Sequence, residues 1–175
     1  MPDLLIVYST VDGQTLRICE RMKTVLEALG QRVTLASIDD HVPGLNAFDT
    51  IVIGASIRYG KHRPSVLAFI EANRRVLDRT PSAFFSVNIV ARKAEKNRPE
   101  SNPYVRKFLT QTTWRPTQLG VFAGRLDYPR YRFFDRQMIR LIMWMTGGPT
   151  DPATIVEYTD WGAVEAFARG LHDRR

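Results

Sequence analysis

Short, uninterrupted apolar runs alternate with longer segments of helical spacing along most of this chain. The run at residues 4–8, Leu-Leu-Ile-Val-Tyr, is typical of a strand buried on both faces of a parallel sheet. After a polar turn, apolar residues recur at helical spacing from Thr15, and Gly30 supplies a stop signal. Repeated alternation of this kind predicts parallel β-α-β units wound on both sides of one open sheet.

This pattern predicts a doubly wound α/β domain with five strands. The strands are expected at residues 4–8, 33–38, 51–55, 83–90 and 121–123, and the helices at 15–29, 64–77, 104–110 and 161–171. A length of 175 residues predicts one domain, residues 1–175. Two segments interrupt the alternation, residues 92–116 and an insert at about 125–147. Both follow predicted strands at the sheet edge where open α/β sheets bind ligands.

Positive charge is concentrated in one third of the chain. Residues 91–147 hold twelve of the 25 Lys and Arg residues but four of the 18 Asp and Glu residues. This asymmetry predicts a face for an anionic partner, whether phosphate, nucleic acid, acidic lipid or a carboxylated small molecule.

Cysteine and histidine content narrows the class of protein. The single Cys19 excludes an internal disulfide, and the three histidines lie far apart in the sequence, so we expect no metal site. No apolar run is long enough to span a membrane, and the first residues lack a basic, signal-like flank. We therefore expect a cytoplasmic protein.

The turn after the first predicted strand is rich in hydroxyl groups. It reads Ser9-Thr10-Val11-Asp12-Gly13-Gln14-Thr15 and leads directly into the first helix. Hydroxyls and backbone N–H groups at a helix N-terminus form a phosphate site without Lys or Arg. The turn is neither a Walker A loop nor a G-x-G-x-x-G fingerprint. It resembles the FMN phosphate loop of flavodoxins; the alternative is that its side chains only cap the helix.

Five further motifs narrow this resemblance. Gly-Ala-Ser-Ile-Arg-Tyr-Gly at residues 54–60 leaves the third strand, and Ser-Val-Asn-Ile-Val-Ala-Arg-Lys at 86–93 leaves the fourth. Trp-Arg-Pro comes next at 114–116 in the basic segment, followed by Tyr-Pro-Arg-Tyr-Arg at 128–132 and Tyr-Thr-Asp-Trp at 158–161. In this order the motifs closely resemble the bacterial menaquinone-dependent protoporphyrinogen IX dehydrogenases, over roughly residues 4–172.

The resemblance implies a flavodoxin-like sheet of order 2-1-3-4-5 and an FMN enzyme of haem biosynthesis. Such an enzyme oxidises protoporphyrinogen IX to protoporphyrin IX and passes electrons to a membrane quinone, menaquinone or ubiquinone. It also implies peripheral attachment to the cytoplasmic face of the bacterial inner membrane. No acid or base role is carried over to any side chain. The expected FMN contacts are Ser9, Thr10, Asp12, Gly13, Gln14, Thr15, Ser56, Ile57, Arg58, Tyr59, Gly60, Ser86, Val87, Asn88, Val90 and Ala91.

The two loops expected around the flavin ring are basic, unlike those of ordinary flavodoxins. Arg58, Arg92 and Lys93 bring positive charge, and Tyr59 is the only aromatic residue in them. A cation near the ring stabilises the anionic reduced flavin and raises its potential. We therefore hypothesise that Arg58 or Arg92 tunes the flavin. The alternatives are solvated loop charges, or contacts to phosphate or propionate.

The insert contains an amphipathic segment. On a helix over residues 130–146, one face carries Tyr131, Phe134, Met138, Leu141, Ile142 and Met145. Such a helix is expected to lie on an anionic bilayer, to shelter a flat tetrapyrrole with two propionates, or simply to pack on the sheet. The candidate substrate or membrane contacts are Arg92, Lys93, Arg132, Arg136, Arg140 and Trp144.

Three other functions are compatible with parts of the sequence. A soluble electron carrier would use the same fold, but such carriers usually dock through acidic surfaces. An NAD(P)H-quinone oxidoreductase would differ in having its flavin reduced by NAD(P)H. A nucleic-acid module fits the high pI but leaves the phosphate loop unexplained, so we expect no nucleic-acid partner.

Overall fold

A five-stranded parallel sheet forms the centre of the chain in the computed structural model, which describes residues 1–174. Its strands are β1 (Asp3–Ser9), β2 (Arg32–Ser37), β3 (Thr50–Arg58), β5 (Ser82–Val87) and β6 (Gln118–Phe122). They lie in the order β2-β1-β3-β5-β6. A two-residue strand, β4 (Lys61–His62), pairs antiparallel with the end of β3 and shifts the numbering. The predicted flavodoxin-like order 2-1-3-4-5 is therefore confirmed.

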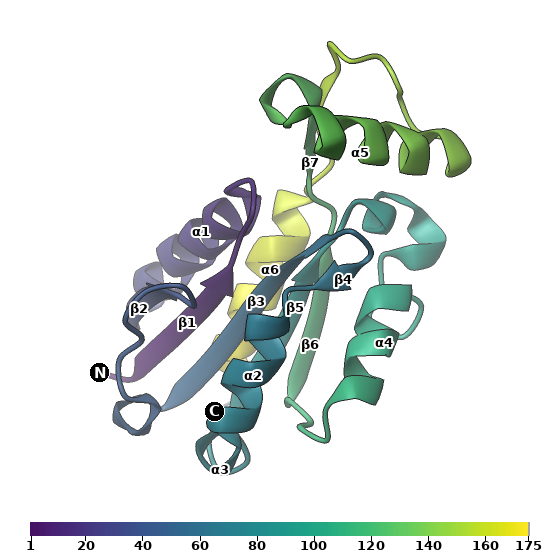
Figure 1. Cartoon of the computed structure of the whole chain (residues 1–175). Coiled ribbons are helices and arrows are strands. Elements are labelled where there is room, and N and C mark those ends of the chain that lie inside the picture. The colour runs from purple at the N-terminus through teal and green to yellow at the C-terminus, as the bar shows by residue number, and fades with distance from the viewer. Residues whose placement is uncertain (175) are drawn as a thin grey trace.

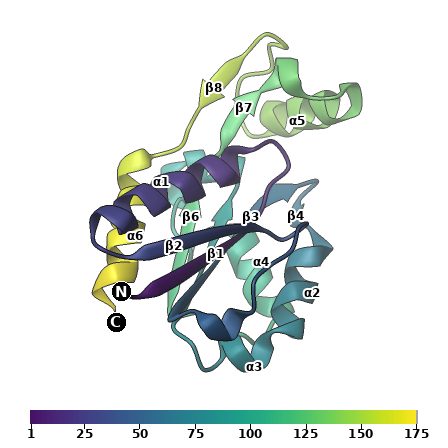
Figure 2. The ribbon, with the colours of Figure 1, turned by 90° about the vertical axis from the view of Figure 1, so that its left-hand side faces the viewer.

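Helices cover both faces of this sheet because its side chains are apolar on both sides. Leu4 and Ile6 of β1 pack towards α1 (Gln14–Ala28) and α6 (Trp161–Asp173), whereas Leu5 and Val7 pack into the opposite cluster. That opposite face is covered by α2 (Pro64–Ala72), α3 (Arg74–Leu77) and α4 (Pro103–Gln111). Figures 1 and 2 show the resulting three layers. Successive strand residues point to opposite faces, so a continuous apolar run needs two helical layers.

Local side chains account for the differences from the predicted boundaries. The helix expected at 64–77 is divided at Asn73, whose Nδ2 donates to the Phe69 carbonyl at 2.8 Å. The strand expected to continue to residue 90 ends at Val87, because the Asn88 side chain accepts from the Ala91 N–H. That bond caps a 3-10 turn, Ile89–Arg92. The fifth strand begins at Gln118, three residues earlier than expected.

A small second layer rises from the carboxyl edge of the sheet. It consists of β7 (Arg125–Asp127), a 3-10 turn (Tyr128–Arg130), α5 (Phe133–Met145) and β8 (Ile155–Glu157), and we call it the insert. β7 and β8 pair antiparallel, and α5 lies above the sheet edge (Figure 1). The insert therefore extends ten residues beyond the segment expected from the sequence, and its helix begins three residues later.

The remaining short elements are 3-10 turns at Leu45–Ala47 and Ala94–Lys96. Within residues 1–174, no helix has the length and hydrophobicity needed to cross a membrane. Cys19 is fully buried on α1, where burial raises the pKa of its thiol. It therefore packs as a small apolar residue.

Candidate functional site

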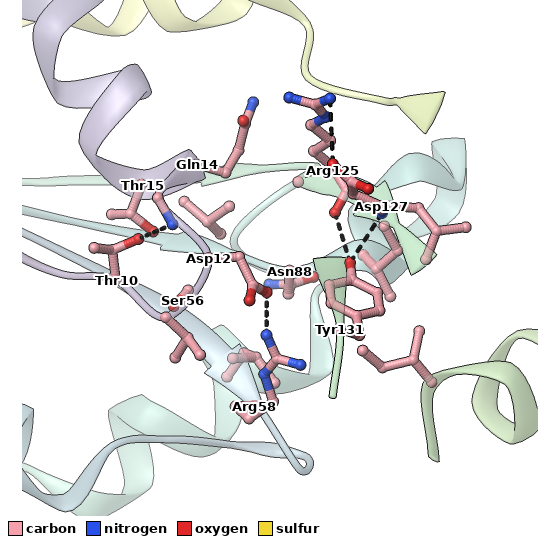
Figure 3. A pocket seen from close by; sticks show the side chains of 18 of the residues that line it. Thr10, Asp12, Gln14, Thr15, Ser56, Arg58, Asn88, Arg125, Asp127 and Tyr131 are labelled. Atoms are coloured by element: carbon pink, nitrogen blue, oxygen red, sulfur yellow. Dashed lines mark hydrogen bonds and ion pairs between the residues drawn. The ribbon is translucent and has the colours of Figure 1, made fainter. Parts of the chain in front are cut away.

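A cavity of about 230 Å³ lies at the carboxyl edge of the sheet, between the loops after β1, β3 and β5 and the underside of the insert. Figure 3 shows its labelled side chains converging from these separate segments. Its walls are formed by Thr10, Val11, Asp12, Gly13, Gln14, Thr15, Arg17, Ser56, Ile57, Arg58, Tyr59, Gly60, Val87, Asn88, Ile89, Tyr104, Gly124, Arg125, Leu126, Asp127, Arg130, Tyr131, Ile139 and Ile142.

The loop after β1 presents an uncapped helix N-terminus to this cavity. Gly13 is the N-cap residue of α1, with φ 90°, and no side chain caps the helix. Thr10 Oγ1 accepts from the Gly13 N–H at 2.9 Å, which closes the turn, and the buried Thr15 Oγ1 has no hydrogen-bond partner among the described residues. The free amides of the first turn and the positive end of the dipole suit an anion. The alternative that this turn only caps the helix is therefore wrong.

Two residues expected in this loop use their side chains elsewhere. Gln14 Nε2 donates to Glu157 Oε1 and to Thr159 Oγ1, both at 2.9 Å, and so joins α1 to the end of the insert. Ser9 is buried, and its Oγ lies 3.3 Å from Arg63 Nη1, outside the cavity wall. The backbone of Gln14 still belongs to the cavity wall.

The loop after β3 is a tight hairpin. Ile57 pairs with His62 and Arg58 with Lys61, which leaves Tyr59 and Gly60 as a two-residue turn. Their φ angles are 53° and 74°, as a type I′ hairpin requires. The buried Ser56 Oγ has no partner among residues 1–174, and Tyr59 is exposed with its hydroxyl bonded to Asp135 of α5. The hairpin therefore forms one cavity wall and contacts the insert.

The side chain of Arg58 lies between the first loop and the insert. It forms an ion pair with Asp12, and its guanidinium carbon lies 5.4 Å from the centre of the Tyr131 ring (Figure 3). The other guanidinium nitrogen, Nη1, is buried without a partner among the described residues. Burial raises the pKa of Asp12, and Arg58 opposes that rise. The cavity thus contains a carboxylate and a guanidinium in contact.

A buried amide network holds the loop after β5. Ser86 Oγ lies 2.9 Å from His62 Nε2 and accepts from Asn88 Nδ2 at 3.0 Å. Asn88 and Asn102 exchange two further side-chain hydrogen bonds, and Asn102 also caps α4. Burial lowers the pKa of His62 to about 4. Val87 and Asn88 line the cavity, whereas Ser86, Val90 and Ala91 lie behind the wall.

The expected basic contacts lie outside the cavity wall. Arg92 donates to the Ile89 carbonyl at 3.2 Å and to Thr146 Oγ1 at 3.0 Å, so it fastens the third loop to the end of α5. Arg136 Nε donates to the Tyr128 carbonyl at 3.2 Å, and Arg140 Nε donates to the Thr150 carbonyl at 2.8 Å. Both arginines fix α5 to its own flanking loops. Lys93, Arg132 and Trp144 also lie away from the cavity.

Helix α5 is apolar on two sides. Met143 is buried, and Ile139 and Ile142 contribute to the cavity wall. The opposite side exposes large apolar side chains to solvent: Phe133, Phe134, Met138, Leu141, Trp144 and Met145, which we call the apolar ridge. Trp144 is 72% exposed and Phe134 79%. The alternative that the predicted stripe packs on the sheet is therefore wrong for Phe134, Met138, Leu141 and Met145, whereas Tyr131 is buried.

Several cavity residues were not expected from the sequence as contacts. Tyr104 of α4 lines the cavity, and Arg125, Leu126 and Asp127 of β7 reach it because the insert folds back over the sheet edge. Asp127 is buried and pairs with Arg125 at 3.3 Å. Neither a spacing nor a motif signalled these residues. Ile142 and Tyr131 carried the helical pattern, but the pattern did not tell which side faces the protein.

Comparison with known proteins gives a consistent set of relatives. The Flavodoxin domain profile matches residues 5–153. The protoporphyrinogen IX dehydrogenase [quinone] of Escherichia coli (strain K12) is 48% identical over 95% of this chain and 93% of its own length. The protein of the same name from Leishmania major is 43% identical over 95% of this chain and 73% of its own length.

Solved structures agree on the fold. Flavodoxin 1 from Bacillus cereus superposes with a TM-score of 0.57 and 13% identity, covering 99% of both chains. A short-chain flavodoxin associated with a bacterial microcompartment gives a TM-score of 0.55 and 14% identity, with 99% of this chain and 98% of the other covered. At such low identity, these likenesses concern the arrangement of strands and helices alone.

Proposed function

The chain belongs to the flavodoxin family and, within it, to the protoporphyrinogen IX dehydrogenases, and we propose that it oxidises protoporphyrinogen IX to protoporphyrin IX using FMN and a quinone. The observation that carries this proposal is the cavity over the N-terminus of α1. Thr15 Oγ1 and Ser56 Oγ in its wall lack partners among the described residues, no side chain caps the helix, and the cavity lies at the edge where α/β sheets of this type bind ligands.

The residues present fit FMN. The first-turn amides of α1 and the orphaned Thr15 Oγ1 suit the phosphate group, which needs several donors and no acidic neighbour on the helix. The hairpin at residues 56–60 and the loop beginning at Val87 form two walls for the flat ring. Ser56 Oγ offers a further unpaired hydroxyl there. When bound, FMN supplies a two-electron acceptor for the substrate and a donor for the quinone.

The protein's own part in the reaction is to hold and shield these groups. Leu126, Tyr131 and Ile139 of the insert contribute apolar side chains to the cavity wall, and these would shield a bound ring from part of the solvent. Conversion of protoporphyrinogen to protoporphyrin removes six electrons, so the substrate must meet this site in three successive two-electron steps. No histidine lines the cavity among the described residues, and the side-chain carboxylates in its wall are Asp12 and Asp127.

We further propose that the apolar ridge of α5 rests on an anionic bilayer at the cytoplasmic face of the inner membrane. A helix lying in the interface exposes Trp, Phe and Leu on one side and carries Arg nearby. The ridge has those residues, and Arg130 and Arg132 are exposed at the N-terminal end of α5. A quinone dissolved in the bilayer would then meet the protein on the side of the insert, above the cavity.

Purification of the protein followed by a fluorescence assay tests the proposed function. The purified protein is expected to be yellow, to release FMN on denaturation, and to form fluorescent protoporphyrin from protoporphyrinogen when a quinone is added without NAD(P)H. Reduction of the flavin by NAD(P)H alone would instead identify an NAD(P)H-quinone oxidoreductase. A colourless protein that does not bind FMN on reconstitution would overturn the proposal.

A second experiment tests the membrane contact. Vesicles containing anionic lipid should carry the protein on flotation, and the double variant Phe134→Ser, Trp144→Ser should remain in solution with its FMN bound. The matched control, Phe48→Ser, changes a partly buried aromatic residue at the opposite edge of the sheet. Equal flotation of the double variant and the parent chain would contradict the bilayer contact.

A further inference from the structure

Arg58 holds a guanidinium in the cavity that is only partly used by the protein. Its side chain is 13% exposed, and the residue lines the cavity wall. One nitrogen, Nη2, donates to Asp12 Oδ2, and the ring of Tyr131 lies beside the guanidinium. Nη1 is buried with no acceptor among residues 1–174. A buried donor of this kind is costly unless a bound molecule supplies the acceptor.

The other cations near the cavity are engaged or exposed. Arg92 bonds to the Ile89 carbonyl and to Thr146, and it does not line the cavity. Arg17 pairs with Glu157 at 2.9 Å, and Arg125 pairs with Asp127 at 3.3 Å. Arg130 is exposed at the surface. Of the basic side chains in this region, Arg58 is therefore the one placed to offer a free donor to a bound ring.

Asp12 opposes the charge of Arg58 at the same place. The two residues come from different loops, after β1 and after β3, so their contact bridges the phosphate end of the cavity and its hairpin wall. The Asp12 side chain is partly exposed, at 43%, whereas that of Arg58 is largely buried. Within the cavity, the electrostatic fields of these two opposite charges therefore partly cancel. Each charge can be removed separately by substitution.

We propose that the Asp12–Arg58 pair sets the reduction potential of the bound flavin. Arg58 stabilises the anionic reduced form through its free donor, which raises the potential, and Asp12 limits that effect. A cation and an anion at similar distances act with opposite signs because the added charge on the ring interacts with both. This inference rests on the proposed FMN site, and it assigns the tuning to Arg58 and not to Arg92.

The test is a spectroelectrochemical titration of FMN bound to the parent chain and three variants. Arg58→Gln should weaken binding of reduced FMN relative to oxidised FMN by about tenfold or more, which for two electrons lowers the potential by about 30 mV. Asp12→Asn should shift the potential upward. Arg92→Gln, the matched control, removes an arginine outside the cavity and should leave the potential unchanged. Arg58→Lys keeps the charge and should fall between the parent and Arg58→Gln.

The outcomes separate this inference from the proposed function. Failure of the parent chain to bind FMN would overturn the function itself. If FMN binds and neither Arg58→Gln nor Asp12→Asn moves the potential, the pair only fastens loops together and the inference is wrong. If Arg58→Gln does not retain FMN, the potential of FMN bound to Asp12→Asn decides the test. An upward shift of that potential supports the inference, and no shift or a downward shift overturns it.

Discussion

The body of the sheet and the insert use the same kinds of side chain in opposite ways. In the body, Phe84 and Phe108 stack with ring centres 3.9 Å apart, and Trp114 packs edge-on against both. All three are fully buried. In the insert, Phe134 and Trp144 stand in solvent on α5. The contrast shows that an apolar pattern specifies a helix but does not specify what covers it.

The size of each region explains the difference. The body has five paired strands with helices on both faces, so every apolar stripe meets another layer. The insert has two three-residue strands and one helix, which is too little to enclose a helix on all sides. Its own small cluster, Leu126, Tyr128, Tyr131 and Met143, fixes one side of α5. The other side of α5 is exposed.

The largest expected effect is on the free energy of unfolding, when an aromatic ring is removed from the body and from the insert in turn. Phe84→Ala removes a buried ring from the aromatic cluster and should lower the free energy of unfolding by about 3–5 kcal/mol. Phe134→Ala, the matched change in the insert, should alter it by less than about 0.5 kcal/mol because that ring is exposed. Urea unfolding measures both. A similar large loss for Phe134→Ala would mean that the ridge is covered by the protein.

The body should also account for part of the loss of stability at acid pH. Burial, helped by Lys107, lowers the pKa of His62 to about 4, whereas the unfolded chain binds that proton near pH 6.5. Stability is therefore lost as pH falls through this window, by about 3 kcal/mol for a group shifted this far. The change His62→Gln should remove that part of the loss. The check is the difference in unfolding free energy between parent and variant at pH 7 and pH 4; equal slopes would contradict it.

Much of the body could be predicted because its strands are continuous apolar runs and its turns carry local signals. The hydroxyl-rich turn at residues 9–15 was predicted to lie at the start of the first helix, and the structure places most of it in the cavity wall. The small strands β4, β7 and β8 could not be predicted, since two or three residues carry no periodicity. Arg136 and Arg140 were expected to face an anionic partner, yet they bond to backbone carbonyls that only the folded insert places beside them.

The sequence also could not predict which side of α5 faces the rest of the protein. Helical spacing groups Met138, Leu141, Ile142 and Met145 on one arc, but it cannot state which edge of that arc meets protein. In the structure Ile142 turns to the cavity and Leu141 to solvent, one residue apart. That choice depends on where β7 and β8 anchor the ends of the insert, which is a tertiary contact.

The two sides of α5 should respond differently to substitution. Leu141→Ser on the ridge should weaken vesicle binding by at least about tenfold, since burial of such a side chain contributes about 1.5–3 kcal/mol, and should leave FMN bound. Met143→Ser, on the buried side of the same helix, should instead destabilise the insert and release its hold on the cavity. Vesicle flotation and thermal unfolding distinguish them. Identical behaviour of the two variants would mean that α5 has no distinct sides.

The smallest expected effect concerns one of the contacts that join the two regions. Arg17 of α1 pairs with Glu157 at the end of β8, and hydrogen bonding from Gln14, together with that arginine, lowers the pKa of this carboxyl. Because both side chains are substantially exposed, a double-mutant cycle with Arg17→Ala and Glu157→Ala should give a coupling of only about 0.2–1 kcal/mol, and less at high salt. A coupling well above this range would contradict the expectation that this ion pair is solvent-exposed and weak. A coupling within this range would leave the other contacts, Tyr59 with Asp135 and Arg92 with Thr146, to hold the insert to the sheet edge.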